Sequence, residues 1–145
     1  MDNIAVLIST CNRNEFLSCI FNYYSKNNFR HKIYVGDASD YDLHILMVHK
    51  IKSKYKNLDI QFVHFPDYNN GLVDNLKVIE QLCELVTEKF ITLTGDDDFL
   101  IPETIEKCIN YLCNNDSYVG IYGTGKFIFY DNYRQKSLIE GNYQL

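Results

Sequence analysis

The sequence predicts an α/β fold in which a mostly parallel sheet carries helices on both faces. Short apolar runs alternate along the chain with segments whose apolar residues recur at helical spacing. The apolar runs lack the polar–apolar alternation of a half-exposed strand, which is typical of strands that a parallel sheet buries on both faces. Strands that alternate with helices over short connections indicate right-handed crossovers within one sheet.

The first strand is expected at residues 4–8, where the sequence reads Ile-Ala-Val-Leu-Ile. A helix should follow, with Asn12 or Asn14 as its cap and Glu15 in its first turn. The apolar face of this helix is formed by Phe16, Leu17, Ile20, Phe21 and Tyr24. Together these residues predict the first strand–helix unit.

The same pattern occurs twice more in the middle of the chain. A strand at 32–36 precedes a helix from about 43 to 55. A strand at 60–65 then precedes a helix whose apolar positions run from Leu72 to Val86. These segments predict the second and third units.

The last part of the chain is expected to add one more unit and two further strands. A strand at 90–93 leads to a helix that opens at Pro102, because proline is favoured at the first helical position. Strands at 118–122 and 127–130 follow, and the second is expected to be antiparallel and to lie at an edge.

The length of 145 residues suits one domain. We expect that domain to span residues 1–134, and the segment 135–145 to be a tail poorly committed to the core. Fourteen basic residues against nineteen acidic ones give a net charge of −5, which disfavours nucleic acid as a partner.

The location expected from the sequence is the cytoplasm. Five cysteines form no Cys-x-x-Cys pair and their number is odd, which favours reduced thiols over disulfides. The sequence contains no apolar stretch of the roughly 20 residues that a transmembrane helix needs, so none is predicted. A basic cluster is expected to be a solvated helix surface, with peripheral contact to the inner face of an anionic membrane as the alternative. This cluster consists of Lys50, Lys52, Lys54 and Lys56.

Three polar segments follow strands of the expected sheet. They are residues 10–13, 37–40 and 95–98, and two of them are rich in carboxylates. Ligands of open α/β sheets bind outside the carboxyl ends of the strands. The sequence therefore predicts that these three segments form one site.

Three consecutive aspartates, Asp96, Asp97 and Asp98, follow the fourth strand. Hard carboxylate ligands suit Mg²⁺ or Mn²⁺, which share their coordination with phosphates and water. Strand alternation would turn Asp96 and Asp98 toward one pocket and Asp97 away from it. The alternative is that the triplet caps the helix at Pro102 or forms a solvated turn. No glycine-rich phosphate loop is present, so a nucleotide's phosphates would be held through a metal.

Four segments in this order resemble the motifs of family 2 glycosyltransferases. Residues 4–13 (IAVLISTCNR) resemble the opening strand of that family, and residues 35–40 (VGDASD) resemble its V-D-D-x-S-x-D segment. Residues 70–72 (NGL) resemble its N-x-G turn. Residues 90–102 (FITLTGDDDFLIP) resemble its Y-I-x-x-L-D-x-D-D-x-x-x-P signature.

This resemblance implies a GT-A, Rossmann-like fold that binds a nucleoside diphosphate sugar, commonly a UDP-sugar. Thr10 and Asn12 would lie beside the base and ribose, and Asp37 would accept a hydrogen bond from the base. Asp96 would approach the ribose and the metal. Arg13 would contact a phosphate or the base, or would lie exposed at the start of the helix.

The resemblance further implies a divalent cofactor, Mn²⁺ or Mg²⁺, bound by the triplet. Either Asp97 or Asp98 aligns with the family's metal aspartate, beside Asp96. The family is inverting, so an acceptor hydroxyl attacks the anomeric carbon while a carboxylate base takes its proton. The acceptor would be a glycan or a lipid-linked molecule.

The chain departs from the family pattern at several places. Cys11 replaces a tyrosine, and Gly36 replaces the first aspartate of the V-D-D segment. The family's catalytic base and acceptor half would follow the part that matches. Asp131 and Glu140 are the only late carboxylates, and neither lies in a recognisable base motif, so no catalytic residue is assigned.

Three functions are therefore considered. The first is a metal-dependent glycosyltransferase or its donor-binding part. The second is a non-catalytic nucleotide-sugar-binding module, which includes a truncated glycosyltransferase without base and acceptor site. The third, less favoured, is a phosphotransfer enzyme or nucleotidyltransferase that uses the aspartates for Mg²⁺. An uncovered half-domain surface would favour self-association into a homo-oligomer.

Overall fold

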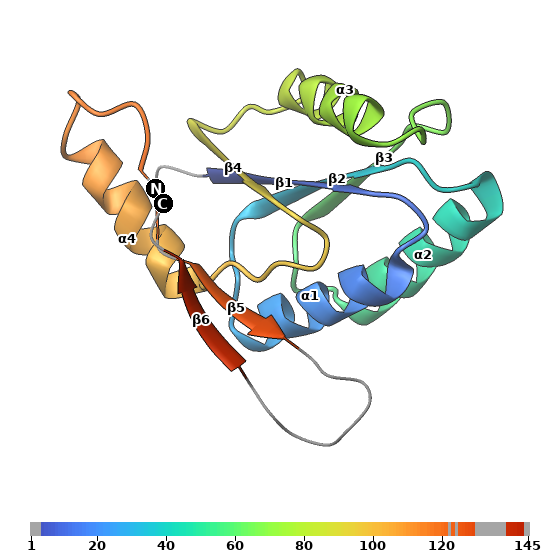
Figure 1. Ribbon diagram of the computed structural model, residues 1–145, viewed down its shortest axis with the longest axis horizontal. Helices are drawn as coiled ribbons and strands as arrows, with labels where there is room; N and C mark the ends of the chain where they lie inside the picture. The colour runs from blue at the N-terminus through green and yellow to red at the C-terminus, as the bar shows by residue number, and fades with distance from the viewer. Residues whose placement is uncertain (1–3, 122, 124, 130–138, 144–145) are drawn as a thin grey trace.

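The computed structural model describes residues 4–121, 123, 125–129 and 139–143. Its main sheet has four parallel strands in the order β3-β2-β1-β4. These strands are β1 (Ile4–Thr10), β2 (Lys32–Asp37), β3 (Ile60–His64) and β4 (Phe90–Thr94). Helices α1 (Asn14–Lys26) and α2 (Tyr41–Lys54) cover one face of the sheet, and α3 (Leu72–Cys83) covers the other (Figure 1). The predicted α/β class with a parallel sheet is confirmed.

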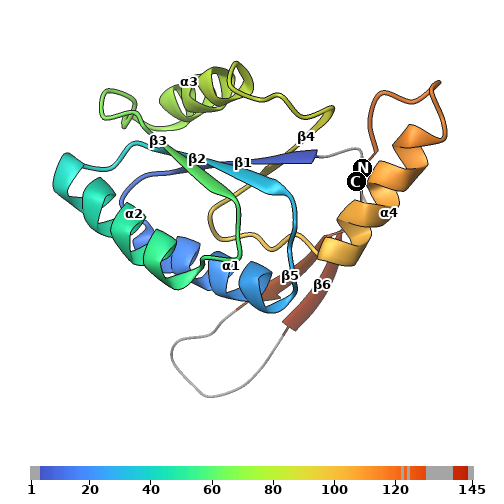
Figure 2. The same ribbon diagram turned by 180° about the vertical axis from the view of Figure 1, so that it is seen from behind.

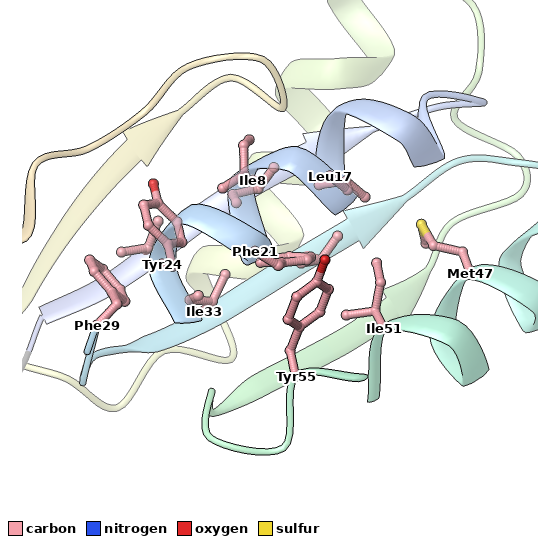
Figure 3. Packing of buried hydrophobic residues seen from close by; sticks show 12 residues of the cluster. Ile8, Leu17, Phe21, Tyr24, Phe29, Ile33, Met47, Ile51 and Tyr55 are labelled. Carbon is pink, nitrogen blue, oxygen red and sulfur yellow. The ribbon is translucent and has the colours of Figure 1, made fainter. Parts of the chain in front are cut away.

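The larger part of the core lies between the sheet and helices α1 and α2. Phe21 of α1 and Ile51 of α2 are fully buried against Ile8 and Ile33 of the central strands (Figure 3). Each such side chain contributes about 1.5–3 kcal/mol when it leaves water. This packing covers one face of β1 and β2, and α3 covers the other, which explains why both strands are apolar on consecutive positions.

On the opposite face, α3 packs closely against β1 and β2. Val78 and Leu82 of α3 are buried against Leu7 and Tyr34. A Cβ atom added at Gly36 would lie 2.3 Å from Cγ1 of Val78, so only glycine lets the helix approach this closely. Residue 36 therefore faces α3. The glycine that replaces the first aspartate of the V-D-D pattern allows this helix to pack closely on β2.

Helix α4 (Pro102–Cys113) lies beside the amino ends of β1 and β4 and is visible from both sides of the molecule (Figures 1 and 2). Ile105 and Ile109 pack on Ile4. The loop before this helix is held by Tyr24, whose hydroxyl accepts a hydrogen bond from the Leu100 N–H at 3.2 Å. Burial raises the pKa of Tyr24 to about 12.

The C-terminal strands differ from the prediction. The prediction of a strand at 118–122 is wrong for residues 118–121, because they form no strand. Tyr122 lies outside the described residues. The side chain of Val119 is fully exposed, so this apolar run lacks the burial that an interior strand requires. Strand β5 (Gly125–Phe129) is antiparallel, as expected, but it pairs with β6 (Ile139–Tyr143) in a separate two-stranded sheet, away from the edge of the main sheet.

Two further findings concern the expected location. In the described part of the chain, no helix has the length and apolar character that crossing a bilayer requires. All five cysteines lie in the described part of the chain, and none of them forms a disulfide. Strand β6 lies within the segment 135–145, and the boundary between domain and tail stays a prediction.

Candidate functional site

The three predicted segments meet at the carboxyl edge of the sheet. Thr10 at the end of β1 is the register partner of Asp37 at the end of β2. Strand β4 pairs with the other side of β1 and ends at Thr94, next to the acidic triplet. Because the strands are parallel, Asp37 and Asp96 lie at the same edge, one on each side of β1.

Thr10 connects the two acidic segments directly. Its main-chain oxygen accepts a hydrogen bond from the Ala38 N–H at 2.9 Å. Its hydroxyl donates to Oδ2 of Asp96 at 2.7 Å, and this contact is buried. The end of β1 thus fixes the position of the Asp96 carboxylate relative to the loop after β2.

The acidic triplet forms a turn and does not continue the strand. The Asp98 N–H donates to the Gly95 oxygen at 3.4 Å, and a Cβ at Gly95 would lie 3.0 Å from carboxylate oxygens of both Asp97 and Asp98. In a turn the alternation of a strand does not apply, so the expectation that Asp97 points away from Asp96 is wrong. The triplet also makes no side-chain cap for α4, which begins at Pro102.

Arg13 bridges Asp96 and Asp97. Its Nη1 lies 2.8 Å from Oδ1 of Asp96, and its Nη2 lies 2.8 Å from Oδ2 of Asp97. The guanidinium also lies 4.3 Å from the ring centre of Phe16, a cation–π arrangement. The hydrogen bond to Asp97 raises the pKa of Arg13 above its ordinary value. Arg13 is therefore engaged with the aspartates and is more than an exposed residue at the helix start.

The electrostatic balance at Asp96 has opposing causes. Burial raises the pKa of its carboxyl above the ordinary value, while the Thr10 hydrogen bond and the Arg13 charge act in the opposite direction. The net direction is upward. A positive group that replaced or joined Arg13 would stabilise the ionised form.

Asp37 is fully buried and accepts hydrogen bonds from two neighbours. Its Oδ1 accepts from the Ser39 N–H at 3.0 Å and from the Ser39 hydroxyl at 2.6 Å. Its Oδ2 lies 2.8 Å from Nδ1 of His44, which donates to the carboxylate. Asp37 thus holds the loop between β2 and α2 in place.

Sequence reasoning missed the two histidines at this edge. The His44 ring stacks on His64 with ring centres 4.2 Å apart. Nε2 of His64 donates to the Ser39 oxygen at 2.7 Å, since a carbonyl only accepts. His64 is the register partner of Asp37 on the neighbouring strand, so knowledge of the strand order would have placed the histidines beside the aspartate. The sequence alone does not supply that order.

Asn12 occupies the turn between β1 and α1. Its φ of 56° is left-handed, a conformation that asparagine tolerates better than most residues. Its N–H donates to the Ser39 hydroxyl oxygen at 2.7 Å. Helix α1 begins at Asn14 without a side-chain cap, so neither Asn12 nor Asn14 serves as the predicted one. A hollow of about 220 Å³ beside this turn is lined by Asn12, Arg13, Asn14, Glu15, Phe16 and Leu43.

The residues fit a divalent cation in part. The described residues contain no group of three or more His, Cys, Asp or Glu side chains arranged to hold a metal ion. Asp96 and Asp97, however, already converge on one positive group, the Arg13 guanidinium. Mg²⁺ and similar ions need only one or two carboxylates when phosphates and water complete the shell. The two carboxylates therefore suit a cation that a diphosphate shares.

Replacing His44 by alanine is expected to lower the free energy of unfolding by about 1–2 kcal/mol, because the buried Asp37 carboxylate loses a hydrogen-bond donor. Urea unfolding followed by circular dichroism measures this difference. His49→Ala, an exposed position of the same helix, is the control and should change stability by less than about 0.5 kcal/mol. Equal effects of the two substitutions would contradict the structural role of His44.

Comparison with solved structures supplies a relationship in fold. No family model matches the chain, and no curated protein sequence matches it. Among solved structures, the mannosyltransferase PcManGT from Pyrobaculum calidifontis, in complex with GDP-Man and Mn²⁺, is similar with a TM-score of 0.62 at 13% sequence identity. The match covers 76% of this chain and 32% of that chain, so this chain spans about a third of the mannosyltransferase. The chain has a glycosyltransferase-like α/β fold.

Proposed function

We propose that this chain is the donor-binding part of an inverting, family 2-like glycosyltransferase. It would bind a nucleoside diphosphate sugar and a divalent metal, and the sugar would pass to a hydroxyl of a glycan or lipid-linked acceptor. The observation that carries the proposal is Thr10, whose main-chain oxygen and hydroxyl join the two acidic loops at the carboxyl edge. The similarity in fold to a mannosyltransferase that binds GDP-Man and Mn²⁺ supports it.

The nucleoside would lie across the ends of β1 and β2. Thr10 and Asn12 would flank the base and ribose. Asp37 already accepts three hydrogen bonds, and a carboxylate has about four acceptor positions. One acceptor position on Oδ2 of Asp37 is left, and because this carboxylate is fully buried, a base N–H would reach it only after the surrounding side chains move aside. The hydrogen bonds from Ser39 to Oδ1 and from His44 to Oδ2 would hold the carboxylate in place before the base arrives.

The diphosphate would lie toward the end of β4. Asp96 and Asp97 would hold Mn²⁺ or Mg²⁺, with Asp98 as the third candidate. When bound, such an ion stabilises the negative charge that grows on the departing diphosphate. The Thr10 hydroxyl keeps the Asp96 carboxylate oriented for this task.

Calorimetric titration tests the proposal. With Mn²⁺ present, UDP or GDP is expected to bind at least about tenfold more tightly than without it, because the metal joins the diphosphate to the aspartates. A preference for UDP would agree with the family 2 resemblance, and a preference for GDP would agree with the donor of PcManGT. The proposal fails if neither nucleotide binds, or if Mn²⁺ leaves the affinity unchanged.

A binding module without catalytic activity is the second candidate. Three described carboxylates of the site are already engaged: Asp37 with Ser39 and His44, and Asp96 and Asp97 with Arg13. Neither of the late carboxylates, Asp131 and Glu140, has a described side chain. This candidate predicts donor binding without sugar transfer or donor hydrolysis. Turnover by this chain alone would exclude it.

Self-association is a further part of the proposal. The face of β4 that lies on the α3 side exposes Ile91 and Leu93, with 45% and 58% of their surfaces accessible. Exposed apolar side chains at this place support the proposal that the chain self-associates.

A further inference from the structure

The guanidinium of Arg13 occupies the position between Asp96 and Asp97 where a metal would lie. Two 2.8 Å ion pairs hold it there, and Phe16 lies against it. The side chain of Asp96 is only 5% exposed, whereas that of Arg13 is 41% exposed. Arg13 can therefore leave toward solvent, while Asp96 cannot.

We propose that Arg13 is a positioning residue that neutralises this acidic turn and competes with a divalent cation for Asp96 and Asp97. The inference rests on the proposed function and assigns Arg13 a role in it. A dication that approaches the two carboxylates meets the fixed positive charge of Arg13, which opposes binding. Once released, the planar guanidinium is suited to bidentate contact with the phosphate oxygens of the donor.

The competition has a consequence for metal affinity without nucleotide. Removal of the Arg13 charge leaves two carboxylates with no positive partner, and they should then take up a cation more readily. An ion pair of this exposure corresponds to about a fivefold change in an equilibrium constant. Arg13→Gln is therefore expected to bind Mn²⁺ about fivefold more tightly than the unaltered chain.

The experiment is a Mn²⁺ titration of the nucleotide-free protein, with free Mn²⁺ followed by electron paramagnetic resonance. Arg13→Lys keeps the charge but cannot bridge two carboxylates as a planar fork, so its affinity should be intermediate. Arg30→Gln makes the same change of charge at an exposed position just before β2, at the opposite end of the strands, and should leave the affinity unaltered. Circular dichroism establishes that each variant is folded.

The outcomes separate this inference from the proposed function. The proposed competition is overturned if Arg13→Gln binds Mn²⁺ no more tightly than the unaltered chain. It is also overturned if the Lys and Gln variants bind Mn²⁺ equally, or if none of these proteins binds Mn²⁺. The proposed function is judged separately, by the binding of UDP or GDP. At saturating Mn²⁺, Arg13→Gln should bind UDP or GDP, whichever the unaltered chain binds, more weakly than that chain does, and an unaltered nucleotide affinity would overturn the phosphate contact.

Discussion

Asp96→Asn is expected to reduce the affinity for a nucleoside diphosphate in the presence of Mn²⁺ by on the order of 100-fold. The substitution keeps the shape of the side chain and one oxygen that can accept from Thr10. It removes the negative charge that would bind the cation at the least exposed member of the triplet. Calorimetry with UDP and GDP, each with and without Mn²⁺, measures the loss. Without Mn²⁺ the variant and the unaltered chain should bind nearly alike.

The stability of Asp96→Asn should change little. Because burial raises the pKa of Asp96, the folded chain holds this proton more tightly than the unfolded chain, and ionisation above the ordinary pKa lowers stability. Asparagine removes that cost together with the Arg13 pair, so the two effects oppose one another. A change below about 1 kcal/mol is expected in thermal or urea unfolding. A variant that loses nucleotide affinity only because it unfolds would contradict this account.

Three further variants complete the test. Asp116→Asn, at an exposed position after α4, makes the same change of charge away from the edge and should leave binding unaltered. Asp97→Asn should lower the nucleotide affinity in the presence of Mn²⁺ more than Asp98→Asn does. The reason is that Arg13 bridges Asp96 to Asp97 and not to Asp98. Full affinity in Asp96→Asn would remove the basis for a metal at this turn.

The sequence predicted the sheet and the edge well because both depend on local pattern. A continuous apolar run identified β1, and the rule for parallel sheets brought Thr10, Asp37 and Asp96 to one edge. The two ion pairs of Arg13 could not be predicted, since they depend on how the residues after Gly95 turn. The contact of His44 with Asp37 likewise requires the path of the loop between β2 and α2.

The region after α4 shows the limit of the apolar-run rule. Residues 118–121 have the composition of a strand, but none of the described strands pairs with them and their side chains are exposed. An apolar run becomes a strand only where backbone partners and a covering layer are available. That information lies in the tertiary structure.

Gly36→Ala is expected to lower the free energy of unfolding by about 3 kcal/mol, near the upper end of the usual range for overpacking. The added methyl group would lie 2.3 Å from Cγ1 of Val78, 3.1 Å from Leu82 and 3.3 Å from Phe65. The neighbouring atoms belong to packed side chains, so α3 must move or the strand must bend. Differential scanning calorimetry should show a decrease in Tm of roughly 10 °C. Gly120→Ala, where no atom lies within 4 Å of the added carbon, is the control and should be neutral.

A double-mutant cycle separates the clash from other effects of a lost glycine. Val78→Ala alone should cost about 2 kcal/mol, because it removes two buried methyl groups. In the double variant the methyl group added at position 36 occupies the space that Cγ1 of Val78 leaves. The double variant should therefore be close in stability to Val78→Ala, well short of the sum of the single losses. Additive losses would mean that Gly36 is required for its backbone freedom, and that the close approach of α3 is not what selects glycine at this position.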